Sequence, residues 1–224
     1  MYVILVSYRA RGTQTFRREE LKGLIQNVND YFTQNRKEYK IVICEQNDDR
    51  GFNRGALLNI AFMLSENLFR MPLTYIHMNA DYRFNTTRRF PDEITNFKSG
   101  FLEMFALPYP VLGSACVFDA NSYRQINGFP NDLWGWGGDD WAIYNRIHAK
   151  HIVIDRPSQI HDNGFITEIK NPHHETDQSK NVFNINLAHR NDLETNGINS
   201  CKFKVDGICE FHNATTVFHY LVSF

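Results

Sequence analysis

Residues 134–141, Trp-Gly-Trp-Gly-Gly-Asp-Asp-Trp, concentrate more potential chemistry than any other stretch of this sequence. Glycine at this density destabilises a helix or a strand, and the adjacent carboxylates Asp139 and Asp140 repel each other unless a cation or a hydroxyl lies between them. A segment that is poor for folding but rich in stacking rings and possible general bases is typical of a functional loop. The alternative is a glycine-rich turn whose tryptophans fill the core.

A second acidic position follows a predicted strand. Residues 73–77 read as a buried strand that runs into Asn79, Ala80 and Asp81. A carboxylate at such a strand end is well placed to hold a divalent metal that bridges phosphates, although Asp is also a common turn or cap residue there. His161 follows a later strand and, paired with Asp81 across the sheet, is a plausible nitrogen ligand for manganese. A lone histidine is more often part of the hydrogen-bonded scaffold.

Cationic side chains gather at the same edge of the predicted sheet. Arg54 falls in the first turn of a predicted helix, where its charge and the free backbone N–H groups suit a phosphate. Phe52 could stack on a base, and Arg9 and Arg11 follow the first strand. The alternative is that these arginines are simply solvated.

The elements that must position these residues alternate along the first part of the chain. Apolar runs predict buried strands, and apolar residues at helical spacing predict helices between them. The predicted strands are 3–8, 39–45 and 73–77, and the predicted helices are 16–34 and 54–68. This βαβαβ order indicates a parallel sheet with right-handed crossovers, in which ligands lie beyond the carboxyl ends of the strands.

The later part of the chain predicts shorter elements and one long loop. Strands are expected at 111–119 and 151–155, helices at 122–126, 140–150 and 183–193, and a closing hairpin from 201–205 and 211–218. Residues 162–182 are polar and without apolar pattern, which suggests a loop or lid. No repeat or linker divides the 224 residues, a length typical of one domain.

Composition excludes several classes of protein. The net charge is −1 without a basic stripe, which argues against a nucleic-acid partner. No apolar run approaches the roughly 18–20 residues of a membrane span, and the start lacks a signal-peptide pattern. We therefore expect a cytoplasmic protein, or one from the Golgi lumen if the sequence is an excised domain. Cys201 and Cys209 flank a turn and could form a disulfide across a hairpin. Their spacing alone does not show whether they do.

Taken together, four motifs resemble the β-1,4-galactosyltransferase family. They are Phe52-Asn-Arg-Gly-Ala-Leu-Leu-Asn59, Ile126-Asn-Gly-Phe-Pro-Asn131, the run 134–140 and Asn196-Gly-Ile-Asn-Ser200. Ser7-Tyr-Arg-Ala-Arg11 is similar to the family's Pro-Phe-Arg-Asn-Arg start. The resemblance extends from there to about residue 205.

The resemblance implies a GT-A fold, an α/β architecture with a Rossmann-like mixed sheet flanked by helices. It implies a single catalytic domain over residues 1–224: a nucleotide-binding half (1–81), an acceptor and catalytic half (82–205) with lid loops around 131–141 and 162–182, and a C-terminal strand segment (206–224). The implied activity is an inverting transfer of galactose or N-acetylgalactosamine from a UDP-sugar, with Mn²⁺, to a glycan or glycoside hydroxyl with formation of a β-linkage.

For the donor side, the resemblance implies a definite set of residues. Asp81 matches the last Asp of the family's Asp-Val-Asp metal motif, Asn79 replaces the first, and His161 matches the metal-binding His. The remaining protein ligand falls on Ser158 or Gln159, neither of which is as good a ligand. The donor-binding residues expected in total are Tyr8, Arg9, Arg11, Phe52, Arg54, Asn79, Asp81, Trp136 and Gly137.

For the acceptor side, the resemblance makes Asp140 the general base, and Asp139 replaces the usual Glu. Trp141 replaces an acidic position, which indicates an acceptor other than N-acetylglucosamine. Val111 falls where galactose-specific members carry a bulky Tyr, so a smaller gate leaves room for an N-acetyl group. The acceptor-binding residues expected in total are Trp136, Gly138, Asp139, Asp140, Trp141 and Val111.

Two other classes of function compete with this interpretation. A catalytically impaired UDP-sugar or glycan-binding module would account for Asn79, Trp141 and the poor ligand at Ser158 or Gln159. A metal-dependent hydrolase built on Asp81, Asp139, Asp140 and His161 is disfavoured, because the sequence lacks a clustered ligand set such as two histidines one helical turn apart.

Overall fold

The computed structural model describes the chain except for six short segments. The described residues are 1–10, 15–105, 111–112, 115–161, 164–170, 181–209 and 216–224, of which 15, 159, 161, 181 and 182 are described by their backbone alone. The strands are β1 (Tyr2–Tyr8), β2 (Tyr39–Gln46), β3 (Thr74–Met78), β4 (Tyr82–Phe84), β5 (Phe101–Glu103), β6 (Ala115–Asp119), β7 (Ile154–Asp155), β8 (Ile166–Glu168), β9 (Lys204–Cys209) and β10 (Val217–Ser223). The helices are α1 (Thr15–Gln34), α2 (Arg54–Leu68), α3 (Asp92–Thr95), α4 (Ala120–Gln125), α5 (Asp139–Ala149), α6 (Ser158–His161), α7 (Asn181–Ala188) and the 3₁₀ turn η2 (Ile198–Ser200).

Eight of these strands form one mixed sheet in the order β7-β5-β6-β3-β1-β2-β10-β9, and β4 pairs with β8 in a second sheet. Strands β3, β1, β2 and β10 run parallel, whereas β6 and β9 are antiparallel to their neighbours. The predicted βαβαβ unit is therefore confirmed. The carboxyl ends of these four parallel strands all lie at one edge of the sheet.

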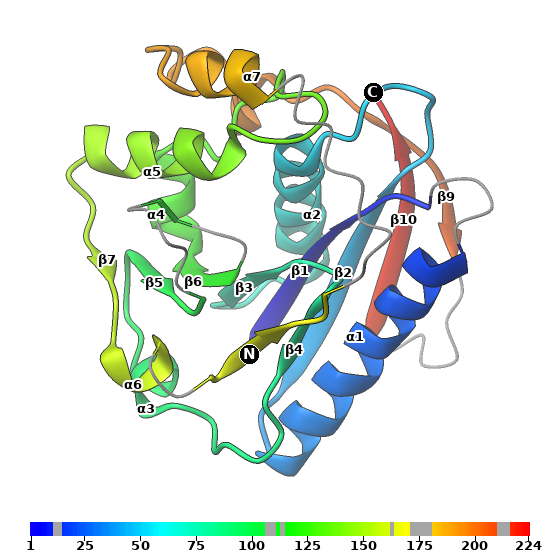
Figure 1. Cartoon of the computed structure of the whole chain (residues 1–224), viewed down its shortest axis with the longest axis vertical. Helices are drawn as coiled ribbons and strands as arrows, with labels where there is room; N and C mark the ends of the chain where they lie inside the picture. The colour runs from blue at the N-terminus through cyan, green and yellow to red at the C-terminus, as the bar shows by residue number, and fades with distance from the viewer. Residues whose placement is uncertain (11–14, 106–110, 113–114, 162–163, 171–180, 210–215) are drawn as a thin grey trace.

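The first strand shows why helices cover both faces of this sheet. Ile4 and Val6 point into the core cluster that contains α1, whereas Val3 and Leu5 point into the cluster that contains α2. All four side chains are fully buried. Successive side chains of a strand face opposite sides, so an unbroken apolar run requires a covering layer on each face. Figure 1 shows α1 along the β2–β10 side, with α4, α5 and α7 grouped at the other side of the molecule.

The structure corrects several expected boundaries. Strand β8 lies inside the segment predicted as a loop, and it pairs with β4, which no pattern indicated, because three-residue strands are too short to show a periodicity. Strand β6 begins at Ala115 rather than 111, β7 spans two residues only, and α7 ends at Ala188 rather than 193. Within the expected 162–182 loop, residues 162–163 and 171–180 lie outside the described part.

The closing hairpin also differs from its prediction. Its strands are Lys204–Cys209 and Val217–Ser223, later in the chain than expected. The apolar residues Cys201 and Phe203 pack against the α2 side of the core instead of pairing as a strand. Cys201 and Cys209 are both free thiols, so a disulfide between them is wrong. Among the described helices, none combines the length and the apolar character that crossing a membrane would require.

Candidate active site

Arg54 begins helix α2, directly after a capped turn. The Asn53 side chain accepts a hydrogen bond from the Ala56 backbone N–H at 2.9 Å, which is a standard helix N-cap. The cap fixes the direction of the first turn, and Arg54 extends from it with only 12% of its side chain exposed. The guanidinium group therefore occupies a defined position at the carboxyl edge of the sheet.

Three polar side chains from two other segments surround the Arg54 guanidinium group. Nε donates to Asp139 and Nη2 donates to Asp140, the first two residues of α5. Nη1 lies 3.4 Å from the amide oxygen of Asn79, which follows β3. The structure thus brings together Arg54, Asn79, Asp139 and Asp140, four of the residues that the sequence predicts for the site. Arg54 is therefore the cation that offsets the repulsion between the adjacent carboxylates of Asp139 and Asp140.

The charges of this group depend on one another. Burial raises the pKa of Asp140, Arg54 opposes that rise, Asp139 adds to it, and the result is a pKa of about 6. Burial alone would lower the pKa of Arg54, but the two carboxylates raise it above its usual value. Arg54 is therefore a permanent cation, and Asp140 is a carboxylate that can gain or lose a proton near neutral pH. A general base requires such a pKa.

Glycine and asparagine hold the loop that leads into α5. Gly138 has a φ of 87°, and a Cβ atom there would lie 2.5 Å from the backbone oxygen of Asn184 in α7. The Asn184 side chain, which is 2% exposed, donates to the carbonyl oxygens of Trp134 and Trp136 at 3.2 and 3.1 Å. Only glycine fits at 138, and α7 fixes the loop from outside.

The two loop tryptophans have different environments. Trp134 packs against Phe224 with ring centroids 5.3 Å apart, and the Arg50 guanidinium lies 4.7 Å from its ring centre. Trp136 is 44% exposed. The core-filling alternative therefore fails for Trp136, which presents a free aromatic face beside the acidic pair.

Buried asparagines join the sequence motifs to one another. Asn59 in α2 donates to the Phe129 carbonyl oxygen at 2.7 Å and accepts from the Tyr123 hydroxyl at 2.8 Å. Asn53 donates to the Asn131 carbonyl oxygen at 2.8 Å. A Cβ atom on Gly55 would lie 2.8 Å from Cβ of Phe129, so glycine permits this close approach.

The same hydrogen-bonded network extends to the C-terminal motif at 196–200. The Asn131 side chain donates to the Gly197 carbonyl oxygen at 2.7 Å, and Asn127 donates to Asn199 Oδ1 at 2.8 Å. Segments 52–59, 126–131 and 196–200 therefore form one hydrogen-bonded unit. Buried, satisfied networks of this kind are rigid, and this one sets the position of Arg54 relative to α5.

Comparisons with known proteins agree with this geometry. Residues 2–71 match the family model described as the N-terminal region of glycosyl transferase group 7, and residues 101–175 match the one described as the N-terminal domain of galactosyltransferase. The chain belongs to the β-1,4-galactosyltransferase family. It is 30% identical to mouse β-1,4-galactosyltransferase 1 over 204 residues, which cover 84% of this chain and 48% of that protein. The bovine enzyme of the same name is 33% identical over 153 residues, covering 64% of this chain and 37% of that protein.

Solved structures confirm the GT-A α/β fold. The catalytic domain of Drosophila β1,4-galactosyltransferase 7, crystallised with xylobiose, aligns with a TM-score of 0.78 at 20% identity, covering all of this chain and 94% of that one. The curated relatives are longer proteins, since the chain spans about half the length of the mouse relative.

Arg9, one of the two predicted cations after β1, contacts the turn between β2 and α2. Arg9 donates to the backbone oxygens of Asp48, at 3.1 Å, and of Arg50. It lines a hollow at the ends of β1 and β2 together with Glu45 and Asp48. Tyr8 is 3% exposed, and burial raises the pKa of its hydroxyl to about 12. Arg11 lies outside the described residues.

The β2–α2 turn meets the tryptophan loop. Phe52 is half-buried, and its carbonyl oxygen accepts from the Gly135 N–H at 2.7 Å. This contact places Phe52 beside the loop that carries Trp136 and Gly137. The predicted donor-side residues on both segments are therefore neighbours.

The predicted metal pair is described in part. Asp81 follows β3, is 9% exposed, and its backbone oxygen accepts from Ile169 N–H at 2.7 Å. His161 ends α6, and its side chain is outside the description. Its neighbour Ile160 is buried in the same core cluster as Ala80 and Tyr82, which flank Asp81. The joint role of Asp81 and His161 stays a prediction, as does that of Ser158 or Gln159.

The remaining acceptor-side predictions lie in different surroundings. Val111 is 1% exposed, and its carbonyl oxygen is 3.4 Å from Nη2 of Arg156. Trp141 packs against the small apolar cluster between α5 and α7, 5.9 Å from the His189 ring. The Trp141 ring thus takes part in the α5–α7 contact.

Two residues that support the candidate site carry no signal in the sequence. Asn184 carries no local signal, because its partners are carbonyl oxygens 48 and 50 residues away. Glu103 is 3% exposed, pairs with Arg156 at 2.9 Å, and its charge contributes to the raised pKa of Asp140. It is the last residue of β5, a three-residue strand that no sequence pattern predicted.

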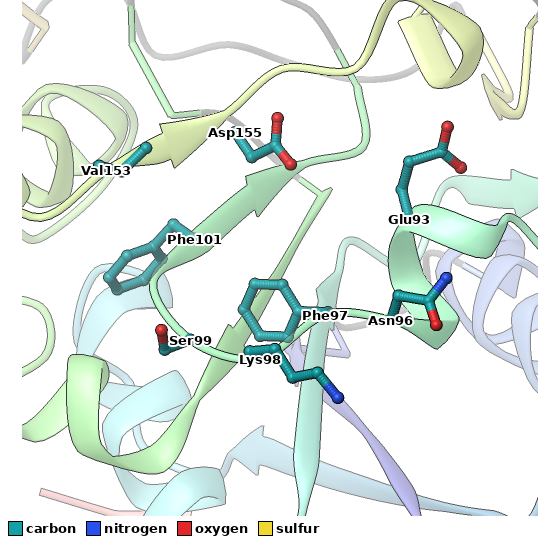
Figure 2. Close-up of a pocket in the computed structure, with 8 residues that line it drawn as sticks. All are labelled: Glu93, Asn96, Phe97, Lys98, Ser99, Phe101, Val153 and Asp155. Carbon is teal, nitrogen blue, oxygen red and sulfur yellow. The ribbon is translucent and has the colours of Figure 1, made fainter.

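A separate hollow lies at the opposite edge of the sheet. Glu93, Phe97, Lys98 and Asp155 line it around Phe101, the first residue of β5 (Figure 2). Strand β5 is antiparallel to β6, which is antiparallel to β3, so its first residue lies away from the carboxyl ends that carry Asn79 and Asp81. The hollow is therefore not part of the candidate active site.

Proposed function

We propose that this protein is an inverting, metal-dependent galactosyltransferase that uses UDP-galactose and forms a β-linkage to a glycan or glycoside hydroxyl. The observation that carries the proposal is the position of Arg54 between Asp139, Asp140 and Asn79. One cation thereby joins the predicted base to the strand end that would hold the nucleotide-sugar. Family membership supports the same reaction.

The donor fits the charges at this edge. Arg9 and Arg54 supply cations near the ends of β1 and α2, and the N-terminus of α2 adds its own positive potential. A variant of the Drosophila β1,4-galactosyltransferase 7 was crystallised with manganese, UDP-Gal and xylobiose. That protein shares 20% identity and the fold with this chain.

Asp81 meets the chemical requirement of a manganese ligand. Its carboxylate is a hard oxygen donor, it follows β3 beside Asn79, and it is almost fully buried. With His161, it would hold the ion next to the sugar diphosphate. Bound manganese would neutralise the charge that develops on the departing UDP.

Asp140 performs the proton transfer in this proposal. The acceptor hydroxyl oxygen forms a bond to C1 of the sugar while the bond from C1 to the phosphate oxygen breaks, and UDP leaves with that electron pair. The hydroxyl proton passes to Asp140. Within the described part of the chain, Arg54 contacts Asp140 through Oδ1, so Oδ2 is the atom that would receive the proton. Attack from the face opposite UDP inverts the configuration at C1.

Substrate selection would rest on a few side chains. Trp136 offers an exposed ring that can cover a sugar face. Asp139 and the backbone at Gly138 border the position of the acceptor. A Val at 111, in place of a bulky Tyr, favours UDP-N-acetylgalactosamine as a second donor. The donor panel must therefore distinguish UDP-galactose from UDP-N-acetylgalactosamine.

The test is UDP release from a panel of UDP-sugars with manganese, with and without simple xyloside and N-acetylglucosaminide acceptors. We expect release that depends on both manganese and acceptor, greatest with UDP-galactose. An Asp140→Asn variant should bind UDP normally and release little. UDP binding without turnover on any donor and acceptor would instead support the impaired binding module.

A further inference from the structure

Three side chains of metal-binding type meet at a second point of the main sheet. They are Glu45 in β2, Cys209 at the end of β9 and His219 in β10, and one ligand atom from each lies within 4.8 Å of the other two. Strand register explains the meeting. Cys209 is directly opposite His219 in the antiparallel pair, and His219 is level with Ile43 in the parallel pair, two residues before Glu45. All three therefore point to the same face.

Two of the three side chains are enclosed, and Cys209 is half-buried. His219 is 3% exposed, and the Glu45 side chain is 15% exposed. His219 Nε2 lies 2.8 Å from Glu45 Oε2, and the Tyr8 ring lies edge-on to the imidazole, with ring centroids 6.5 Å apart. Electrostatic interactions are strong in such surroundings.

The donor set and its spacing fit one class of ion. Thiolate, imidazole and carboxylate together are the usual ligands of zinc, which binds them tetrahedrally. In that geometry, ligand nitrogen and oxygen atoms lie roughly 3.3 Å apart at the usual bond lengths. The Glu45–His219 contact would have to widen by only about half an ångström to admit the ion, a change that side-chain rotation provides.

The charge balance also favours a cation here. The Glu45 carboxylate lies beside the Cys209 sulfur, so an ionised thiol there would be repelled by it. A divalent ion removes this repulsion and stabilises the thiolate, as metal ions generally do for a coordinating thiol.

We propose that Glu45, Cys209 and His219 form a zinc site with three protein ligands and a fourth position for water. The site is separate from the residues expected to hold manganese. Asp81 follows β3, and strand β1 lies between β3 and β2. Because its ligands come from β2, β9 and β10, bound zinc would clamp the C-terminal hairpin to the parallel part of the sheet, beside the hollow lined by Arg9 and Glu45.

The test is titration of the metal-free protein with Zn²⁺, and with Co²⁺ as a spectroscopic probe, without any sugar nucleotide. We expect one tight zinc equivalent, a higher melting temperature, and a cobalt spectrum with a thiolate charge-transfer band and intense tetrahedral d–d bands. The Cys209→Ser and His219→Asn variants should each lose at least the roughly 10–100-fold in affinity that removal of an outer-shell partner costs.

Two controls separate this site from other sites. Cys201→Ser removes a thiol that lies against α2 rather than in the cluster, and it should leave zinc affinity and the cobalt bands unchanged. Asp81→Asn should do the same while weakening the manganese dependence of any UDP release. If a ligand variant fails to fold, the wild-type protein still provides a test, since zinc should slow alkylation of Cys209 and not of Cys201.

The proposal is wrong if no zinc equivalent binds to the metal-free protein, or if zinc does not protect Cys209. It is equally wrong if zinc binding and the cobalt thiolate band survive Cys209→Ser. Glu45 and His219 would then form a hydrogen-bonded pair and nothing more.

Discussion

Arg54 lies against Asp140, 86 residues away in the chain, and donates to its Oδ1 atom from Nη2. The same guanidinium group holds Asp139 through Nε. The predicted base is thus kept charged and oriented by a residue of another motif. Its raised pKa is the net result of burial, of the opposing charge of Arg54 and of the added charge of Asp139.

The first prediction concerns the pH dependence of transfer. A protonated Asp140 cannot accept the hydroxyl proton, so kcat/KM should fall as the pH drops through about 6, the pKa of Asp140. Asp139→Asn removes a negative neighbour that raises this pKa, so the acidic limb of the pH–rate profile should move to lower pH. A pH–rate profile of both proteins checks the shift. An unchanged or higher midpoint in the variant would contradict the assignment.

The second prediction concerns the identity of the base. Asp140→Asn keeps the shape of the side chain but removes its basicity, so kcat should fall by the roughly 10²–10⁴-fold that general-base catalysis contributes. UDP affinity, measured by calorimetry with manganese, should change little. Full activity with normal donor binding would show that another group takes the proton.

The third prediction concerns stability. Arg54→Met leaves two poorly solvated carboxylates without their cation, and breaking a buried pair costs about 3–5 kcal/mol. Without Arg54, the pKa of Asp140 in the folded protein should rise further. The stability that Asp140 contributes is then present at low pH and is lost as the pH rises through the raised pKa. The loss in free energy of unfolding caused by Arg54→Met should therefore be larger at pH 8 than at pH 5.

Denaturant unfolding at both pH values measures this difference. Arg54→Lys is the matched control, because it keeps the charge but loses the two-pronged geometry, and its penalty should depend less on pH. A penalty for Arg54→Met that is equal at pH 5 and pH 8 would argue against a repulsion between ionised carboxylates.

The fourth prediction compares the two loop tryptophans. Trp136→Ala should reduce kcat/KM and change the free energy of unfolding by no more than about 0.5 kcal/mol, since its ring is largely outside the core. Trp134→Ala removes the contacts with Arg50 and Phe224, and should destabilise the fold by about 0.5–3 kcal/mol. Paired unfolding and rate measurements would show the contrast, and the reverse pattern would exclude a sugar-covering role for Trp136.

The fifth prediction concerns the support of the loop by α7. Asn184→Asp replaces the donor of two hydrogen bonds with an acceptor that faces two carbonyl oxygens. Leaving such groups unsatisfied costs about 1–3 kcal/mol. The loop should become accessible to limited proteolysis and transfer should slow. The exposed Asn186 of the same helix is the control position, where the same substitution should have little effect on either measurement.

The sequence by itself determined the parallel half of the fold and the identity of most candidate site residues. Residues 3–6 are all apolar, which is typical of a strand buried on both faces, and the predicted strand 3–8 forms β1. The helix predicted at 54–68 has the same bounds as α2, because its cap and its apolar spacing are both local signals. The motif at 134–141 likewise predicted a loop, which the structure has up to Gly138, where α5 begins with Asp139; its function stays a prediction.

Only the tertiary structure decided which of these residues meet. The contact between Arg54 and Asp140, the hold of Asn184 on the tryptophan loop and the Glu45–Cys209–His219 cluster all join segments that are far apart in sequence. Short strands such as β4 and β8 also required it, because their stability comes from pairing rather than from pattern. Hydrophobic periodicity indicates which face of a segment is buried. Long-range contacts depend instead on sheet order and register, which no local pattern indicates.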